Sequence, residues 1–165
     1  MATQPVRPRR PGPLVDSSPE DVHPVLRGAG APPAALDLLA RAHTALDEAA
    51  ATEAPNERYA AAHLAALRSA AAVLAVRGRP EATPRGRRRI RSAWEVLPEV
   101  APELDEWAAL FEAGAERRAR AEAGVPGAAG RREADDLVRD AETFVRVVER
   151  LLSLRPALPP PRRVG

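Results

Sequence analysis

Residues 57–77 read ERYAAAHLAALRSAAAVLAVR, and this stretch decides the fold of the chain. It is rich in alanine, a strong helix former, and it stops at Gly78. Its apolar residues recur at three- and four-residue steps in two adjacent stripes, so most of the helix circumference is apolar. We therefore predict that residues 57–77, capped by Asn56, form the central helix of a helical bundle.

Amphipathic helices are predicted on both sides of this segment. The first spans residues 34–53 and is ended by Pro55. Its apolar face is expected to consist of Leu36, Leu39, His43, Leu46 and Ala50. The last spans residues 131–154, with an apolar face of Leu137, Ala141, Phe144, Val148 and Leu151. Acidic residues in its first turn and arginines near its end suit the helix dipole.

Glycines and prolines divide the region between these helices. Residues 78–90 are predicted to form a loop. Ser92 and Glu95 then have the spacing of a capping box, which opens a short helix that Pro98 is expected to stop. A longer helix is predicted over 102–123, with a buried stripe of Leu104, Trp107 and Phe111. No segment alternates like a strand, so we predict an all-α, antiparallel four-helix bundle with one extra short helix.

The ends of the chain differ in composition from its middle. Residues 1–33 and 155–165 are rich in proline, glycine and arginine without hydrophobic periodicity, so both are predicted to be disordered tails of a bundle over 34–154. The N-terminus has no apolar segment of the signal-peptide type, and no apolar stretch of about 18 residues lacks charges. These features predict a cytoplasmic protein that does not enter a membrane.

Composition excludes several kinds of site. The chain has no cysteine, which rules out disulfides, Cys-type zinc sites and thiol catalysis. Three scattered histidines are too few for a zinc site, and no glycine-rich phosphate loop is present. We therefore expect no metal and no cofactor. All 25 basic residues are arginine against 23 acidic residues, so the net charge is only +2 and gives no general signal for nucleic acid.

Four blocks of sequence resemble a family of small actinobacterial HEPN-domain proteins (higher eukaryotes and prokaryotes nucleotide-binding). The blocks are ERYAAAHLAAL (57–67), RSAWEVL (91–97), VAPELDEWA (100–108) and READDL (132–137). The resemblance implies a HEPN bundle of four or five helices and a homodimer. Many HEPN proteins are metal-independent ribonucleases of toxin–antitoxin or defence systems, while others look like inactive modules that bind RNA or a partner.

Arg58 and His63 are the candidate catalytic residues. HEPN ribonucleases typically use an Arg followed, after four to six residues, by a His, and this pair has that spacing. The histidine would act as general acid and base on the ribose 2′-hydroxyl, and the arginine would stabilise the phosphorane charge. The alternative interpretation is a hydrogen-bonded core or interface histidine, because His63 lies on an apolar stripe and Tyr59 replaces the polar residue that usually follows the arginine. His43 has the same alternative interpretation.

Charge is segregated within the bundle. Residues 34–153 carry 18 Arg and 20 acidic residues, whereas residues 77–91 alone carry seven Arg and one Glu, a net charge of +6. Phosphate groups are the natural ligands of such a loop. The candidate nucleic-acid-binding residues are Arg85, Arg87, Arg88, Arg89 and Arg91. The alternative is a solvated loop that pairs with the acidic run beginning at Glu95.

The sequence therefore favours a non-enzymatic HEPN-like binding module that acts on RNA, a nucleotide or a protein partner. The first alternative is a metal-independent HEPN ribonuclease of the toxin or defence type, which would be an endoribonuclease. The second is a purely structural scaffold. These hypotheses differ in whether the Arg58–His63 pair is assembled for chemistry and in where charge lies on the surface.

Overall fold

A computed structural model describes residues 32–78 and 91–152 of the chain, and these residues contain helices and no strand. The elements are α2 (Pro33–Ala51), α3 (Pro55–Arg77), α5 (Ala93–Val100), the 3-10 turn η2 (Pro102–Leu104), α6 (Asp105–Ala113), α7 (Ala115–Glu122) and α8 (Arg131–Leu151). The predicted all-α fold is confirmed. The two predicted tails and residues 79–90 lie outside the described residues.

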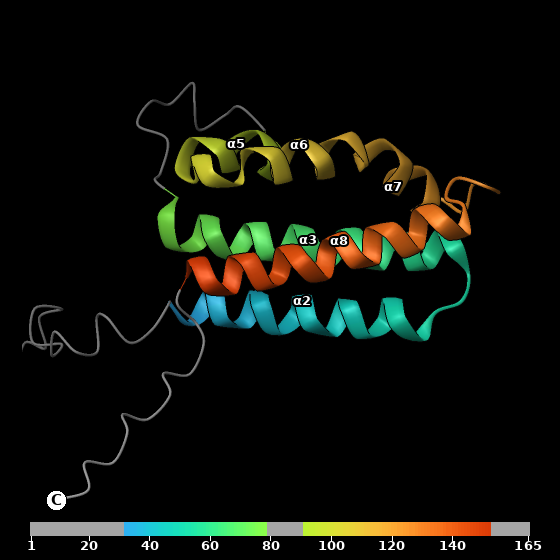
Figure 1. The fold of residues 1–165 in the computed structure, drawn as a ribbon, viewed down its shortest axis with the longest axis horizontal. Coiled ribbons are helices and arrows are strands. Elements are labelled where there is room, and N and C mark those ends of the chain that lie inside the picture. Colours follow the sequence, from blue (N-terminus) through green and yellow to red (C-terminus); the bar gives the residue numbers. More distant parts are fainter. Residues whose placement is uncertain (1–31, 79–90, 153–165) are drawn as a thin grey trace, which may run out of the picture. The chain divides into compact units, whose positions relative to one another are not determined.

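Helix α3 is the centre of the bundle. It packs most extensively against α2, then against α8, and it also contacts α5 and α7 (Figure 1). Nine of its residues are buried, and five of them are alanines that permit close helix–helix approach. Helices α3 and α8 lie between α2 on one side and α5, α6 and α7 on the other (Figure 1). The central position predicted for residues 57–77 is the observed one.

Length and composition alone would also allow α3 to cross a membrane. Half of its most apolar window is buried inside the bundle, however, against the helices on either side. His63 and Ser69, both on this helix, are fully buried polar residues that form hydrogen bonds within the domain. Because core helices of bundles pass the same test of length and hydropathy, we interpret α3 as the core helix of this domain.

The buried face of α2 differs from the predicted one. Leu36 and His43 are exposed, and the residues that are buried are Ala35, Leu39, Ala42, Ala45 and Ala49. The observed buried face is thus rotated about the helix axis from the predicted face, by somewhat less than the ~100° that separates consecutive residues. The physical reason is packing distance. A face of alanines lets α2 lie close to the equally alanine-rich α3, whereas the larger side chains of the predicted face would hold the two helices apart.

Several predicted helix ends are wrong by a few residues. Pro55 does not end the first helix, which stops at Ala51, but occupies the first position of α3. Asn56 is not the cap of α3. Its side chain instead donates to Val125 O (2.8 Å) and accepts from Ala129 N (3.0 Å), fixing the turn before α8. Pro98 lies inside α5 rather than at its end. The predicted Ser92 cap is observed, since its hydroxyl accepts from Glu95 N.

An aromatic cluster fills the space between α5 and α6 on one side and α8 on the other. Phe111 and Phe144 are fully buried, with ring centroids 5.1 Å apart, and Trp94 stacks on Phe111 at 5.1 Å. Trp107 was predicted in the buried stripe of its helix but is only partly buried, at the edge of the cluster 5.6 Å from Phe144. The side chains of this cluster hold α6 over α8, although the two backbones do not pack closely.

Candidate functional site

His63 is enclosed in the core, with only 1% of its surface exposed. Its Nε2 lies 2.9 Å from the carbonyl oxygen of Phe111. Because a carbonyl only accepts, Nε2 carries the proton and donates it, and Nδ1 bears the lone pair. Nδ1 has no hydrogen-bond partner among the described residues. The imidazole is nearly perpendicular to the rings of Trp94 and Phe111, whose centroids are 5.8 and 6.0 Å from its own.

This environment keeps the imidazole neutral. Burial lowers the pKa of His63, the hydrogen bond to Phe111 opposes that effect, and the nearby charge of Arg118 lowers the pKa further. A second proton would have to bind Nδ1, which has no hydrogen-bond acceptor near it among the described residues. A general base must also lie within hydrogen-bonding reach of the proton that it takes. The buried position of His63 does not offer that reach to an external ribose.

His63 and Tyr59 lie one turn apart on α3, and both side chains contact the backbone at the break between α6 and α7. The carbonyl of Phe111 accepts from His63 and also from Gly114 N, at 3.1 Å. The hydroxyl of Tyr59 reaches Gly114 O at 3.5 Å. A Cβ added to Gly114 would come within 2.5 Å of that hydroxyl. The helix predicted over 102–123 is therefore divided, because side chains of α3 bond to its backbone at the break.

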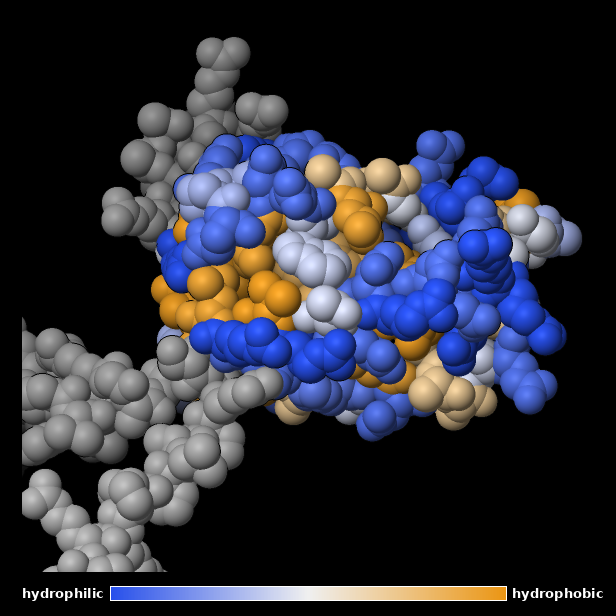
Figure 2. Space-filling view, viewed as in Figure 1, coloured by the Kyte–Doolittle hydropathy of each residue, from blue (hydrophilic) through white to orange (hydrophobic). Residues whose placement is uncertain are grey.

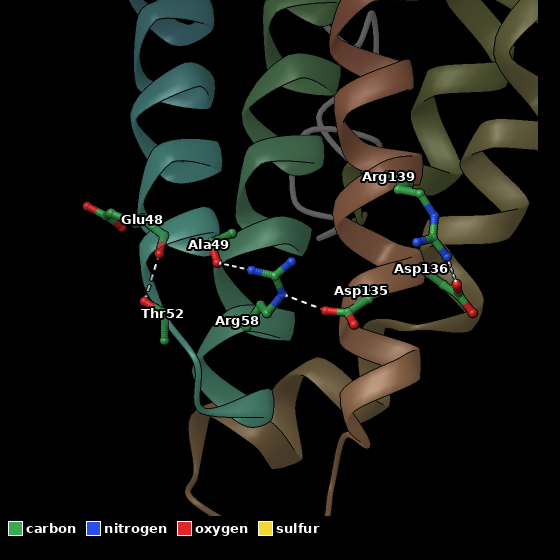
Figure 3. Close-up of polar contacts among 7 residues, drawn as sticks. All are labelled: Glu48, Ala49, Thr52, Arg58, Asp135, Asp136 and Arg139. Atoms are coloured by element: carbon green, nitrogen blue, oxygen red, sulfur yellow. Dashed lines mark hydrogen bonds and ion pairs between the residues drawn. The ribbon is translucent and has the colours of Figure 1, made fainter.

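Arg58 links three helices at one end of the bundle. Its Nε donates to Asp135 Oδ1 of α8 (2.9 Å), and one terminal nitrogen donates to Ala49 O near the end of α2 (2.7 Å) (Figure 3). Ala49 is in the last turn of α2, where a positive charge is favourable because the helix dipole has its negative end there. The side chain is only 23% exposed. Arg58 thus connects α3 to the end of α2 and the start of α8.

The structure does not bring the two candidate catalytic residues together. Five residues along a helix correspond to a rotation of about 140°. Arg58 accordingly points to α2 and α8, while His63 points into the core towards α6. The apolar stripe through His63 was the sequence signal for this burial. The carbonyl partners of both side chains had no signal in the sequence.

His43 occupies a different environment from the one predicted. It is exposed and pairs with Glu149 of α8, so it is not a core histidine. This pair lies beside a shallow depression of about 270 Å³ between α2 and α8, which His43, Leu46 and Arg146 help to line. A second depression of about 260 Å³ is lined by Arg58, Asp135 and others. Sequence reasoning missed the His43–Glu149 pair because the two residues are distant along the chain.

Of the candidate nucleic-acid-binding residues, only Arg91 lies among the described residues. It forms ion pairs with Glu95, at 3.8 Å, and with Glu99 of α5. Its side chain is only 19% exposed. Arg91 therefore packs against the acidic run that begins at Glu95. Arg85, Arg87, Arg88 and Arg89 lie outside the described residues.

Three further acidic residues of α8 lie in its first three turns. Glu133 accepts from Gly130 N at 2.8 Å and pairs with Arg117 of α7 at 3.1 Å. Asp136 pairs with Arg139 one turn away (Figure 3). Partial burial and the neighbouring Asp136 raise the pKa of Asp140. Among residues 32–78 and 91–152, no three His, Asp or Glu side chains converge as metal ligands would.

The family model described as SAV_6107-like HEPN matches residues 49–149, from the end of α2 to α8. The chain belongs to this HEPN family. The match covers the central helix α3, the aromatic cluster and the α6–α7 break, so the predicted resemblance is confirmed as a family. No curated protein and no solved structure matches the HEPN chain.

Proposed function

We propose that this HEPN domain is a non-catalytic binding module whose partner is a protein. The observation that carries the proposal is His63, which is buried and donates to Phe111 O. The motif that would supply catalysis thus has its histidine in the core and its arginine bound to Asp135 and Ala49. Both side chains contribute to holding the helices together, which is a structural task.

Surface charge supports a protein partner over a nucleic acid. The described residues carry 13 Arg and 19 acidic side chains, a net charge of −6. Seven of these arginines form ion pairs within the domain. A phosphate backbone is attracted by accumulated, accessible positive charge, and a net negative body opposes it. The bundle itself is therefore better suited to protein recognition.

The experiment that tests this function uses the full chain and labelled single-stranded RNA without added metal. We expect intact RNA after prolonged incubation, and equally intact RNA with Arg58→Ala and His63→Ala. Retention on a filter is measured in the same samples, because a nucleic-acid-binding module would retain RNA without cutting it. The proposal fails if the wild type cleaves RNA and both variants, still folded by circular dichroism, do not.

A further inference from the structure

Helix α2 carries a second line of residues beside its buried alanine face. Leu36, His43, Leu46 and Ala50 recur at steps of three, four and seven residues, so they share one side of the helix. Leu36 is 48% exposed, His43 and Ala50 are exposed, and Leu46 is partly buried. This side faces α8, because His43 pairs with Glu149. Four of the five residues predicted as the apolar face of α2 therefore lie along the surface beside α8.

The space between these two helices is a groove, which we name the α2–α8 groove. It consists of the two depressions of about 270 and 260 Å³, which adjoin because Ala50 lines both of them. Leu46 of α2 and Val145 of α8 give it an apolar lining. Figure 2 shows the face of the molecule that carries α8, where hydrophobic patches are exposed beside hydrophilic residues. The groove thus offers apolar surface next to charged side chains.

Negative charge without a partner lies along the groove. Asp47 and Glu142 line the first depression from opposite helices, and Glu53 lines the second. None of these three forms an ion pair within residues 32–78 and 91–152. Arg131 and Arg146 also line the groove, but both belong to α8, on either side of Glu142 along that helix. The α2 side is therefore suited to an occupant that combines apolar and basic side chains.

The segment that directly follows α8 has this composition. Residues 153–165, which lie outside the described residues, read SLRPALPPPRRVG and contain three arginines and no acidic residue. Leu158 is followed by three prolines and then by Arg162 and Arg163. A run of prolines favours an extended polyproline chain, which has little conformational entropy left to lose when it binds a groove. The segment thus offers an apolar side chain and two positive charges in an order that the groove can accept.

The directions of the two helices bring this segment to the groove. Helices α2 and α8 are antiparallel, since His43 pairs with Glu149 near the end of α8, whereas Arg58 joins Ala49 to Asp135 near its start (Figure 1). A chain that leaves the end of α8 and folds back would therefore enter the groove beside His43. It would run from there towards the start of α8.

The length of the segment also fits the groove. Glu142 lies ten residues before Leu152, which corresponds to about 15 Å along α8 at 1.5 Å per residue. An extended chain spans the same distance in about five residues at ~3.1 Å each. After a turn of two or three residues beyond Leu152, Leu158 would lie over Leu46. The arginines four and five residues later would then lie among the acidic residues of the groove.

We propose that residues 153–165 fold back and bind the α2–α8 groove of their own chain. The segment lacks hydrophobic periodicity, so it would bind as an extended chain in exchange with solvent, and protease would still remove it from the unbound state. While bound, it would cover Leu46 and Val145 and neutralise Asp47, Glu53 and Glu142. The inference goes beyond the function proposed above and does not depend on it, because it concerns a contact within the chain.

Disulfide trapping in the full chain tests this contact, because the chain has no cysteine of its own. Ala50→Cys places a thiol in the groove, and Pro159→Cys places one directly after Leu158. The matched control combines Pro159→Cys with Glu48→Cys, since Glu48 is exposed on α2 about 200° around the helix from Ala50. In a glutathione buffer, the groove pair should form its disulfide within one chain with an effective concentration at least about tenfold above that of the control pair. Circular dichroism verifies that each variant is folded.

Charge reversal then tests which residues make the contact. Arg162→Glu with Arg163→Glu should lower the effective concentration of the groove pair to that of the control pair, because like charges would meet in the groove. Asp47→Arg with Glu142→Arg should do the same. All four changes together should restore most of the trapping, and such non-additive recovery identifies a direct contact.

Two reversals elsewhere on the surface control for the change in net charge. Glu106 and Glu112 are exposed acidic residues of α6, so Glu106→Arg with Glu112→Arg should leave the trapping unchanged. An equal effect of this pair and of the groove pair of reversals would overturn the docking.

Other outcomes separate this inference from the proposed function. Equal trapping of the groove and control cysteine pairs overturns the docking. Disulfides that join two chains also overturn it, because they would place the segment in the groove of a second copy. RNA cleavage that depends on Arg58 and His63 would overturn the non-catalytic function and leave the docked segment in place.

Discussion

At the scale of single residues, burial of His63 makes the stability of the domain depend on pH. Burial lowers the pKa of the native imidazole, whereas in the unfolded chain the pKa of this histidine is about 6.5. The contribution of neutral His63 is therefore complete above the unfolded pKa. This stabilisation is lost as the pH falls from the unfolded pKa to the lower native pKa. In that range the unfolded state binds a proton at His63 and the native state does not.

Urea unfolding at pH 7.5 and at pH 5 measures this effect. We expect the wild type to lose stability between the two. The control is His63→Gln, whose amide can donate to Phe111 O but does not titrate. Its loss over the same interval should be smaller, because the variant lacks the buried imidazole that resists protonation. Equal losses in the two proteins would show that His63 is not held neutral by the fold.

Phe144 and Trp107 should contribute differently to the free energy of unfolding. Phe144 is fully buried, so Phe144→Ala should cost about 3–5 kcal/mol, the range for large aromatic truncations in a core. Trp107 is partly exposed at the edge, so Trp107→Ala should cost clearly less. Thermal and denaturant unfolding of both variants compares them. A larger loss for Trp107→Ala would contradict the observed packing and favour the fully buried position expected from its helical stripe.

At the scale of the elements, the break between α6 and α7 depends on close contact with α3. Gly114→Ala would place a Cβ 2.5 Å from the hydroxyl of Tyr59, so it should destabilise the domain by about 1–3 kcal/mol. Tyr59→Phe removes that hydroxyl. The double variant should therefore lose less than the sum of the two single variants in urea unfolding. Strict additivity would indicate that the hydroxyl is not the group that Gly114 accommodates.

At the scale of the whole molecule, the sequence predicts a helical core with two disordered tails. Limited proteolysis should remove both tails and leave a fragment near residues 34–155. The reason is that proteases cut exposed chain without regular structure most readily. Mass spectrometry identifies the fragment, and circular dichroism should show it to be as helical as the bundle. A first cut inside α3 or α8 would contradict this domain organisation.

The arginine-rich residues 77–91 carry a net charge of +6 and are the candidate site for nucleic acid. Any affinity for nucleic acid is expected to come from phosphate contacts, with an affinity that falls steeply as salt increases. Changing Arg87, Arg88 and Arg89 together to Gln should remove most of that binding and flatten the salt dependence without changing the melting temperature. Filter retention over a salt series measures it. Binding unaffected by the triple change would place any nucleic-acid contact elsewhere on the chain.

The sequence by itself determined the class of fold and the central helix. Hydrophobic periodicity and the positions of proline and glycine were enough for α3, α8 and the Ser92 cap, because these features act between residues close in the chain. The family was also visible in the sequence, since its blocks keep their order from residue 57 to residue 137. Pro55, Asn56 and Pro98 were misplaced because local rules alone do not fix helix ends.

Only the tertiary structure decided which face of α2 is buried and what the candidate catalytic pair does. The rotation of α2 follows from the small side chains of α3, which lies alongside it but is a separate segment of the chain. The partners of Arg58 and His63 are Asp135, Ala49 O and Phe111 O, between 9 and 77 residues away. Two of these three are backbone carbonyls, which every residue type possesses, so no sequence pattern marks them. The positions of these carbonyls depend on how whole helices pack. The same packing directs Arg58 and His63 to different parts of the bundle, although their spacing in the sequence had suggested one site.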